Sequence, residues 1–455
     1  MQAFDVTRCI GLVEKAMPFR VYGRVTDVVG LLVEVGGITP SVGEICLLRP
    51  VGSERAVQLE VVGFRSGRAL MMPLGGMEGI GPGSRVEQTG ERAATGLGDA
   101  IVGRVVDGLG EPIDGLGKIA VTGRSSIYGR PINPLERSRI REPLDIGIRS
   151  INGLITIGKG QRVGIMAGSG VGKSVLMGML ARYTRADVNV IALIGERGRE
   201  VREFIENELG EEGLKKSVVV AATSDQPALV RLRAASLATT YAEFFRDKGM
   251  DVLLMMDSAT RVAMAQREVG LAVGEPPTTK GYPPSAFALL PRLLERSGTA
   301  ARGSITGLYT VLVEADDMND PVADTMRSIL DGHIVLSREL ASRGHYPAVD
   351  ILQSTSRVMV DITDERHRAA AKKFVEVLAD YRSSEDLINI GAYKSGSSAS
   401  IDRSIRLRGP MSDFLAQGLR EKVSFQESVR DLFKLFDGEG GYGDVKSGSG
   451  PKVQT

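Results

Sequence analysis

The first hydrophobic pattern along the chain is helical. Val6, Ile10, Val13 and Met17 recur at i, i+4, i+7 and i+11, with charged residues between them. This spacing places the four side chains on one face of a helix, so residues 1–18 are predicted to form a short amphipathic helix. The apolar face needs a partner, which is either the helix's own domain or another protein for which the segment is a docking element.

From Arg20 to Gln88 the pattern changes to short β-rich runs that glycines separate. Runs of this kind, with turn residues between them, are typical of a small closed barrel. We therefore expect a β-barrel domain over residues 19–90, with strands at Val21–Val29, Leu31–Val35, Glu44–Leu48, Ala56–Phe64, Ala69–Pro73 and Gly83–Glu87. The polar, small-residue stretch Glu91–Ala100 is expected to be the linker that follows the barrel.

Apolar strands then alternate with helical patterns up to about residue 363, which is typical of a parallel α/β sheet. Strands buried on both faces should be almost continuously apolar or β-branched, as are Val188–Ile194, Ser217–Ala221, Val252–Met256 and Ser304–Val313. Helical periodicity returns beyond Asp364. It places apolar residues on one face of each of two helices, namely Phe374, Leu378 and Tyr381, then Phe425, Val429, Leu432, Phe433 and Phe436.

The predicted fold class is α/β, with an N-terminal small β-barrel over residues 19–90 and a central parallel-sheet domain over residues 98–363. A C-terminal helical domain over residues 364–437 and a Gly/Ser-rich flexible tail over residues 438–455 complete the prediction. A chain of 455 residues, 42% hydrophobic and 25% charged, suits several globular domains of this kind.

Composition excludes several classes of protein. The two cysteines and three histidines show no metal-ligand spacing, which argues against a disulfide framework or a zinc site and favours a reducing cytoplasm. Charged residues interrupt the N-terminus, and no apolar run approaches the ~18 residues that span a bilayer, so membrane association is expected only through partners. A net charge of +1 does not resemble the basic face of a nucleic-acid binder.

One apolar strand runs straight into a glycine-rich loop and then into a helix, at Arg162–Ser174. Gly168, Gly170 and Gly172 allow backbone N–H groups to turn toward an anion. Lys173 supplies a point charge for the β- and γ-phosphates of a nucleotide, and Ser174 offers a hydroxyl to Mg²⁺. Since the positive end of the helix dipole points at the same place, the stretch is predicted to be a P-loop.

Ala167 replaces the first glycine of the G-x-x-x-x-G-K-[ST] pattern. Alanine is compatible with the loop only if this residue keeps a negative φ. The residues expected to bind nucleotide in this stretch are Ala167, Gly168, Ser169, Gly170, Val171, Gly172, Lys173, Ser174 and Val175.

Two carboxylates follow apolar runs, where open parallel sheets bind their ligands. Asp257 is placed to hold the Mg²⁺ that Ser174 contacts, directly or through water, or else to cap a helix without any metal. Glu196 is suited to polarise a water for attack on a γ-phosphate, with Arg197 holding it or neutralising charge. An ordinary salt bridge at a helix start explains the segment around Glu196 equally well.

The motifs together resemble the rotary-ATPase superfamily over nearly the whole chain. They are GSGVGKS at 168–174, GERGREV at 195–201, LLMMDSATR at 253–261, GEPPTTKGYPPS at 274–285 and HYPAVDILQSTSR at 345–357. Within the superfamily the chain is most similar to the flagellum-specific ATPases of the bacterial type III protein export apparatus. The resemblance implies a RecA-like central domain that hydrolyses ATP with Mg²⁺.

The same resemblance implies residue roles. Lys173 and Ser174 match the residues that bind phosphate and Mg²⁺, and Glu196 matches the residue that activates water. Arg357 in STSR matches the arginine finger donated across a subunit boundary, and Tyr346 matches the position whose ring stacks on adenine, unless it is a core tyrosine. Phe425 matches the second adenine residue poorly, so core packing is the favoured role for its ring.

One chain that carries both Glu196 and Arg357 can complete the site of an identical neighbour. In ATP-synthase heterohexamers these two roles belong to different subunit types, so we expect a homohexameric ring. An arginine finger supplied in trans can contribute ~10³–10⁵ in rate, so catalysis should depend on assembly.

The resemblance also implies partners and a location. The expected partners are a stator-like regulator of the ATPase at the N-terminal helix, a coiled-coil central stalk export protein, export-gate membrane proteins and chaperone–substrate complexes, but no nucleic acid. The acidic loop Glu314–Pro321 and the proline-rich loop Gly274–Pro284 are expected to face the stalk or to be plain surface loops. The location implied is cytoplasmic, peripheral at the cytoplasmic face of the inner membrane.

Four other functions compete with export of flagellar proteins. An injectisome type III secretion ATPase is expected to differ mainly in the amino-acid sequence of its P-loop. An ATP-synthase catalytic subunit would lack Arg357. A Rho-like RNA translocase should interleave aromatic and basic residues in its barrel, whereas residues 20–88 offer only Tyr22 and Phe64. A ring subunit that does not hydrolyse ATP is disfavoured by the intact pair Lys173 and Glu196.

Overall fold

The structure is a computed structural model that describes residues 19–50, 52, 56–313 and 320–437. The predicted N-terminal helix, most of the acidic loop and the C-terminal tail lie outside the described residues. The described residues form two compact units that interleave in sequence. Of the described residues, the first unit holds those up to Arg139 with Lys159–Ala167 and those in Ala186–Leu330, and the second holds Ile140–Gly158, Gly168–Arg185 and those from Asp331 on.

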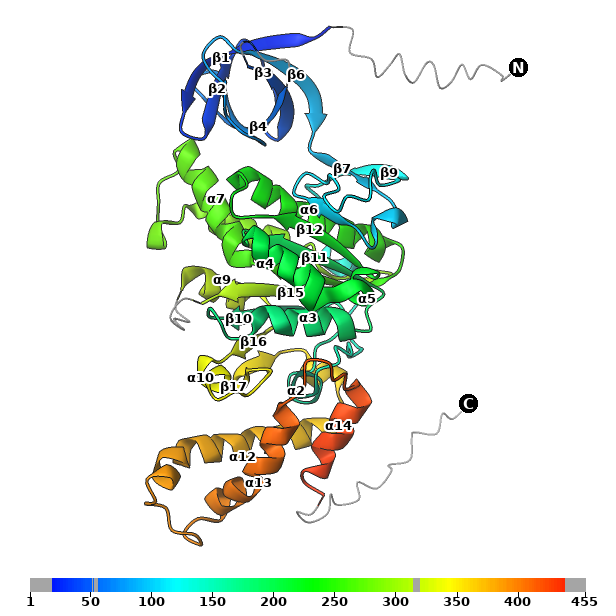
Figure 1. Cartoon of the computed structure of the whole chain (residues 1–455), viewed down its shortest axis with the longest axis vertical. Helices are drawn as coiled ribbons and strands as arrows, with labels where there is room; N and C mark the ends of the chain where they lie inside the picture. The colour runs from blue at the N-terminus through cyan, green and yellow to red at the C-terminus, as the bar shows by residue number, and fades with distance from the viewer. Residues whose placement is uncertain (1–18, 51, 53–55, 314–319, 438–455) are drawn as a thin grey trace, which may run out of the picture. The chain divides into compact units, whose positions relative to one another are not determined.

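The first unit begins with a closed, antiparallel six-stranded barrel, drawn in blue in Figure 1, which confirms the predicted β-barrel. Its strands pair in the order β1-β2-β5-β4-β3-β6. Apolar residues that alternate along the strands meet in one core, and Val33, Leu48 and Leu59 there are completely buried. The strands are β1 Val21–Val29, β2 Leu32–Gly36, β3 Glu44–Arg49, β4 Val57–Arg65, β5 Arg68–Pro73 and β6 Arg85–Arg92.

The stretch Glu91–Ala100, expected to be a linker, has regular structure instead. Strand β6 continues to Arg92, and β7 (Ala94–Leu97) pairs with β9 (Gly123–Ser126) in a two-stranded antiparallel ribbon. Thr95 in β7 is buried, and its hydroxyl lies 3.0 Å from the hydroxyl of Tyr241. The polar, small residues of Glu91–Ala100 did not predict this ribbon, because β7 is defined by its pairing with β9, which lies far along the chain.

A parallel sheet forms the centre of the first unit and confirms the predicted α/β class. Its strands in this unit lie in the order β8-β12-β11-β13-β15-β10, and short β14 adds an antiparallel pair to β15. Every residue of β11 is buried, as expected for a strand covered on both faces. The strands are β8 Val105–Asp107, β10 Arg162–Ala167, β11 Val188–Ile194, β12 Ser217–Ala222, β13 Asp251–Asp257, β14 Gly298–Thr299 and β15 Ser304–Leu312.

Helices cover this sheet, and the longest of them in this unit, α6, packs on β11, β12 and β13. Its buried face is rich in alanine, which lets a helix approach a sheet closely. The helices of the unit are α4 Gly198–Glu203, α5 Gly210–Leu214, α6 Ala228–Asp247, α7 Ala259–Val273, α8 Pro284–Leu294 and α9 Pro321–Ile329. Three-residue 3₁₀ turns are η1 Asp99–Ile101, η2 Pro134–Glu136 and η4 Thr279–Gly281, and η3 Phe204–Leu209 is a π-helical segment.

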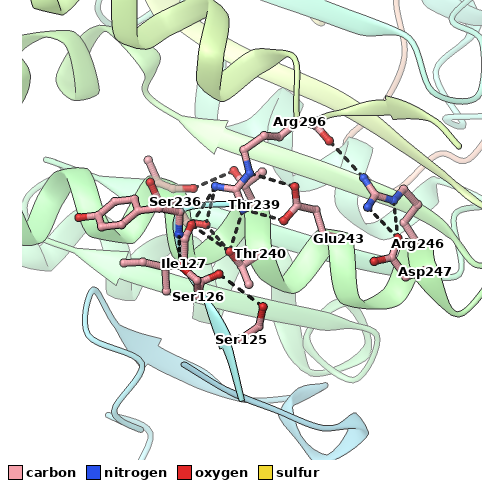
Figure 2. A network of polar contacts seen from close by, with 12 residues as sticks. Ser125, Ser126, Ile127, Ser236, Thr239, Thr240, Glu243, Arg246, Asp247 and Arg296 are labelled. Carbon is pink, nitrogen blue, oxygen red and sulfur yellow. Dashed lines mark hydrogen bonds and ion pairs between the residues drawn. The ribbon is translucent and has the colours of Figure 1, made fainter. Parts of the chain in front are cut away.

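A buried arginine ties α6 to the segment that follows the ribbon (Figure 2). The guanidinium of Arg296 forms a two-pronged ion pair with Glu243, at 2.9 and 2.6 Å. It also donates to the hydroxyl of Thr240 at 2.8 Å and to the carbonyl of Ile127 at 2.9 Å. Because the buried charge is paired and hydrogen-bonded in a fork geometry, its desolvation is compensated.

A second buried pair joins the barrel to α6 less completely. Glu60 of β4 accepts a 2.7 Å hydrogen bond from the hydroxyl of Tyr128, and Nη1 of Arg233 lies 3.6 Å from Oε2 of Glu60. Oε2 of Glu60 and both Nε and Nη1 of Arg233 have no hydrogen-bond partner. Burial raises the pKa of Glu60 above its ordinary value, although the Tyr128 hydroxyl and Arg233 oppose the rise.

The second unit contains α3 (Lys173–Tyr183), an antiparallel pair of strands and the C-terminal helices. Half of the predicted apolar positions of the C-terminal domain are buried, namely Phe374, Tyr381, Leu432 and Phe436, whereas Leu378, Phe425, Val429 and Phe433 are partly buried. The remaining elements are α2 Arg149–Leu154, β16 Gly332–Leu336, α10 Arg338–Ser342, β17 Val349–Ser356, α11 Met359–Ile362, α12 Glu365–Asn389, α13 Ala399–Leu415 and α14 Phe425–Lys434. Within the described residues, no helix is long and apolar enough to cross a membrane.

Candidate active site

The glycine-rich loop begins directly after β10, which ends at Ala167, and leads into α3, which starts at Lys173. The backbone needs φ values of 77° at Gly170 and 87° at Gly172. Residues that carry a side chain rarely adopt such positive φ values, so glycine is required at these two positions. Gly172 is also the N-cap of α3, so the turn delivers the chain directly into the helix.

Ala167 meets the condition that the sequence pattern set for it. It is the last residue of β10, and among the described non-glycine residues only Ser66 and Lys280 have positive φ. Alanine at this position therefore costs no backbone strain.

The loop exposes some residues and anchors others. Ser169, Gly170 and Ser174 are exposed, Lys173 is half-buried, and Val171 is 1% exposed. The buried side chain of Val171 thus anchors the loop, whereas the exposed loop backbone and the first turn of α3 are accessible to a ligand. Lys173 and Ser174 lie at the positive end of an eleven-residue helix, which suits them to bind phosphate.

Tyr346 lies against this loop. A Cβ built on Gly172 would be 3.3 Å from Cε1 of the Tyr346 ring, so the ring sits at contact distance from the loop. Tyr346 is 41% exposed, which excludes the alternative of a core tyrosine. Its backbone carbonyl accepts a 2.9 Å hydrogen bond from the N–H of Gln417. A half-exposed aromatic ring beside a phosphate loop offers a stacking surface to a base.

Asp257 is the last residue of β13 and is 3% exposed. Its Oδ1 accepts a 2.6 Å hydrogen bond from the hydroxyl of Thr310 on β15. The N-cap of the following helix α7 is Ser258, whose hydroxyl accepts from the N–H of Arg261 at 3.3 Å. The alternative that Asp257 caps this helix is therefore wrong, and its carboxylate is held in place by Thr310.

Glu196 follows the end of β11, with only Gly195 between. Strands β11 and β13 are parallel neighbours with Leu193 opposite Asp257, so the structure brings Glu196 and Asp257 to the same edge of one sheet. Glu196 is half-buried, and its backbone carbonyl accepts from the N–H of Ser224 at 3.0 Å.

Arg261 also belongs to this edge, although the sequence analysis did not single it out. A Cβ built on Gly195 would lie 2.9 Å from Cβ of Arg261, so the arginine side chain packs directly on the backbone before Glu196. Nε of Arg261 is buried without a hydrogen-bond partner. Its position in the first turn of the helix after Asp257 was the available signal, because that turn starts at the carboxyl edge of the sheet.

Arg197 is the N-cap residue of α4, and its side chain is 82% exposed. Its Nη1 lies 3.4 Å from Oε1 of Glu200, while the Glu200 carboxylate accepts from the Arg197 backbone N–H. Salt bridges of the kind considered for this helix start are therefore present, between Arg197 and Glu200 and between Arg199 and Glu203.

Arg357 and Phe425, which the sequence analysis also considered, belong to the second unit, and their surroundings differ from each other. Arg357 follows β17, is exposed, and donates its backbone N–H to the carbonyl of Asp331 at 3.0 Å. The ring of Phe425, at the start of α14, packs edge-on against the ring of His367 with 5.8 Å between centroids. This contact agrees with the packing role favoured for Phe425.

Each of the two residues predicted to hold Mg²⁺ offers an oxygen, the kind of ligand that this ion prefers. Mg²⁺ in such sites is commonly held by one or two protein oxygens together with phosphates and waters. The exposed Ser174 hydroxyl and the Asp257 carboxylate are oxygens of the required kind. In the part of the chain that the structure describes, no group of three or more His, Cys, Asp or Glu residues forms a separate metal cluster.

Models of known protein families match three stretches of the chain. The nucleotide-binding domain of the ATP synthase alpha/beta family matches residues 147–356. The beta-barrel domain of the same family matches residues 25–90, and the C-terminal domain of the T3SS EscN ATPase matches residues 363–434.

Curated relatives are similar over almost their whole length. The flagellum-specific ATP synthase of Bacillus subtilis is 55% identical over 433 residues, which cover 94% of this chain and 98% of that protein. The type 3 secretion system ATPase of Xanthomonas euvesicatoria is 50% identical over 418 residues, 92% of this chain and 95% of that protein.

Solved structures share the fold. The assembled ATPase EscN from the enteropathogenic E. coli type III secretion system has a TM-score of 0.86 and 43% identity, covering 91% of this chain and 99% of that one. EscN in complex with its central stalk EscO has a TM-score of 0.84 and 42% identity, with the same shares covered.

Proposed function

Because the chain belongs to the ATP synthase alpha/beta family, among its flagellum-specific and type III secretion ATPases, we propose that it hydrolyses ATP to drive export of flagellar proteins. Its task is to drive or prime type III export, by unloading chaperone–substrate complexes at the export gate. The observation that carries the proposal is the loop between β10 and α3, whose positive φ values at Gly170 and Gly172 lead into Lys173. Tyr346, in contact with this loop, accounts for recognition of a base.

In this proposal Lys173 and the loop N–H groups from Ala167 to Val175 bind the phosphates of ATP. Glu196 takes the proton of the attacking water as it adds to the γ-phosphate in line with the leaving oxygen. Ser174 and Asp257 would each offer an oxygen to the Mg²⁺ that accompanies the nucleotide, and this ion would supply charge neutralisation for the reaction. Tyr346 stacks on the adenine ring, and its exposed ring at contact distance from Gly172 supports that role.

Arginines neutralise the charge that develops on the transferred phosphoryl group. Arg197 acts within its own chain, and Arg357 acts in the site of a neighbouring copy. The exposure of Arg357 suits donation to another chain, and a chain with both Glu196 and Arg357 builds complete sites from identical copies. The proposed assembly is a homohexameric ring, which the assembled state named for the EscN structure supports.

The flagellar branch is favoured over the injectisome branch by the higher identity to the Bacillus subtilis relative. The structure of EscN with its central stalk supports a stalk protein as a partner of this chain, and the partner proposed is a coiled-coil export protein. The further partners proposed are a stator-like regulator, export-gate membrane proteins and chaperone–substrate complexes. They would hold the protein at the cytoplasmic face of the inner membrane.

The test is to replace Lys173 by alanine and to measure ATP affinity and phosphate release separately. Because Lys173 supplies the charge at the β- and γ-phosphates, Lys173→Ala should weaken ATP binding by about tenfold or more and abolish measurable turnover. A matched control is Lys372→Ala, since Lys372 makes only an exposed ion pair with Glu376 on α12.

The control should keep the affinity and the rate of the unchanged protein. Wild-type protein that releases no phosphate from ATP under any assembly condition would contradict the proposal, as would a Lys173→Ala variant with normal turnover. Hydrolysis that depends on RNA would point instead to a Rho-like translocase.

A further inference from the structure

The segment Ala416–Val423, which we call the strap, links α13 to α14 in the second unit. It has no regular secondary structure, yet hydrogen bonds hold it at several points along its length. The carbonyl of Leu419 accepts from the hydroxyl of Tyr183 at 2.7 Å and from the guanidinium of Arg182 at 3.2 Å, both at the C-terminal end of α3. The N–H of Val423 donates to the carbonyl of Gly147 at 3.2 Å.

Gln417 is the centre of this arrangement and is 5% exposed. Its Oε1 accepts from the backbone N–H of Arg149 at 2.7 Å. Its Nε2 donates to the carbonyl of Gly147 at 2.8 Å and to the carbonyl of Glu421 at 2.7 Å. The side-chain amide thus uses its acceptor and both its donors, and only glutamine or a close mimic could satisfy all three partners.

The backbone of Gln417 has a separate task. Its N–H donates to the carbonyl of Tyr346 at 2.9 Å. Tyr346 in turn places its ring against Gly172 of the phosphate loop. A continuous path therefore runs from the strap, through one backbone hydrogen bond, to the aromatic ring beside the loop.

Arg149 joins the C-terminal end of α13 to the same point. Its guanidinium donates to the carbonyl of Asp413 at 3.0 Å and to the carbonyl of Ala416 at 3.1 Å, and it pairs with Glu421. The end of α13 and the strap are therefore held by one residue, whose own N–H is fixed by Gln417.

We propose that Gln417 is a positioning residue that fixes Tyr346 beside the phosphate loop and so links the base side of the nucleotide site to α13. This inference rests on the proposed function, because it takes Tyr346 to be the residue that meets the base. The physical reason is that a half-exposed ring attached to a loop keeps one position only if its backbone is held. The amide of Gln417 holds the strap, and the strap holds the carbonyl of Tyr346.

The test replaces Gln417 by methionine, which keeps the length of the side chain and removes its hydrogen bonds. We expect the KM for ATP to rise about tenfold while kcat stays within about twofold, because the ring binds substrate and takes no part in the chemical step. Inhibition by inorganic tripolyphosphate, which lacks a base, should keep its inhibition constant within about twofold. An equal loss for ATP and tripolyphosphate would overturn the proposal, since it would mean that Gln417 merely holds the unit together.

A double-mutant cycle separates positioning from general damage. In a Tyr346→Ala background, Gln417→Met should add less than about a twofold change in KM, because the residue that it positions is already gone. Additive effects would overturn the proposal. The matched control is Gln426→Met, a change at an exposed glutamine at the start of α14, which should leave KM unchanged.

A milder variant keeps the test meaningful if Gln417→Met folds poorly. Tyr183→Phe removes only the hydroxyl that donates to Leu419, and it should raise the KM for ATP about threefold with kcat unchanged. An unchanged KM in Tyr183→Phe together with an unfolded Gln417→Met would overturn the proposal. Failure of the proposed function would be recognised separately, because wild-type protein would then show no ATP hydrolysis at all.

Discussion

The ends of the neighbouring strands β13 and β11 each carry a carboxylate, and the two are held differently. Asp257 ends β13 itself, is 3% exposed and accepts a 2.6 Å hydrogen bond from Thr310. Glu196 stands beyond the end of β11 after Gly195, is half-buried, and is followed by the exposed Arg197. A group that holds a cation must keep one position, whereas a base must reach a water, and the two environments match those needs.

Glu196→Gln gives the largest expected effect. If Glu196 is the base, the rate of phosphate release should fall by about 10²–10⁴ while ATP binding is unchanged, because the amide keeps the size and loses the proton acceptor. Steady-state phosphate release and calorimetric titration of ATP measure the two quantities. A near-normal rate would show that Glu196 is not the base. The two carboxylates at the strand ends would then not differ in role as proposed.

Asp257→Asn should weaken Mg²⁺ binding and should not impair removal of the proton from the attacking water. We expect the Mg²⁺ concentration for half-maximal hydrolysis to rise by about 10–100-fold, with the rate at saturating Mg²⁺ much less affected. A magnesium titration of ATP hydrolysis measures this. If Asp257→Asn lowered the saturated rate as strongly as Glu196→Gln and left the Mg²⁺ requirement unchanged, the two carboxylates would not have separate roles.

Thr310→Val sharpens the comparison with a smaller change. It removes the hydroxyl that holds Asp257 and keeps the β-branched shape on a strand buried at this point. Loss of one hydrogen bond to a charged group costs about 1.5–3 kcal/mol, of which rearrangement recovers part, so the Mg²⁺ requirement should rise by about fivefold. Thr306→Val, a change at another buried threonine of β15 whose hydroxyl accepts from the N–H of Gly160, should leave the Mg²⁺ requirement as it is.

Glu60→Gln, at a buried carboxylate outside the site, gives the smallest expected effect. Because burial raises the pKa of Glu60 in the folded protein, its contribution to stability is present below the unfolded pKa and is lost as the pH rises through the folded pKa. Glutamine cannot ionise, so the change in melting temperature between pH 5 and pH 8 should become smaller by about 2 °C. Thermal unfolding at the two pH values measures this, and an unchanged difference would show that Glu60 does not titrate in this range.

Much of the fold could be predicted because it follows from local patterns. The bounds of β1 and β11 are those expected from their alternating and continuous apolar residues. The stretch Glu91–Ala100 could not be predicted because β7 is defined by pairing with β9 and not by its own composition. The closed order of the barrel strands likewise depends on pairings that sequence periodicity does not reveal.

The site divides in the same way. Lys173, Ser174 and the loop glycines could be predicted from the sequence, because they form one motif with fixed local spacing. Thr310 and Arg261 were missed because each meets its partner only through the order of the strands or the start of a helix. Gln417 was missed because its partners lie far from it in the sequence, on the segments around Gly147 and Tyr346.

The central claim is that ATP is hydrolysed in a site that one copy of the chain begins and the next completes. The direct measurement mixes unassembled Glu196→Gln and Arg357→Ala chains in equal amounts and follows phosphate release. Each variant alone should be nearly inactive, and the mixture should regain up to about a quarter of the wild-type rate, because some sites then combine an intact Glu196 with an intact Arg357 from the neighbour. A mixture no more active than the two variants measured separately would contradict the claim.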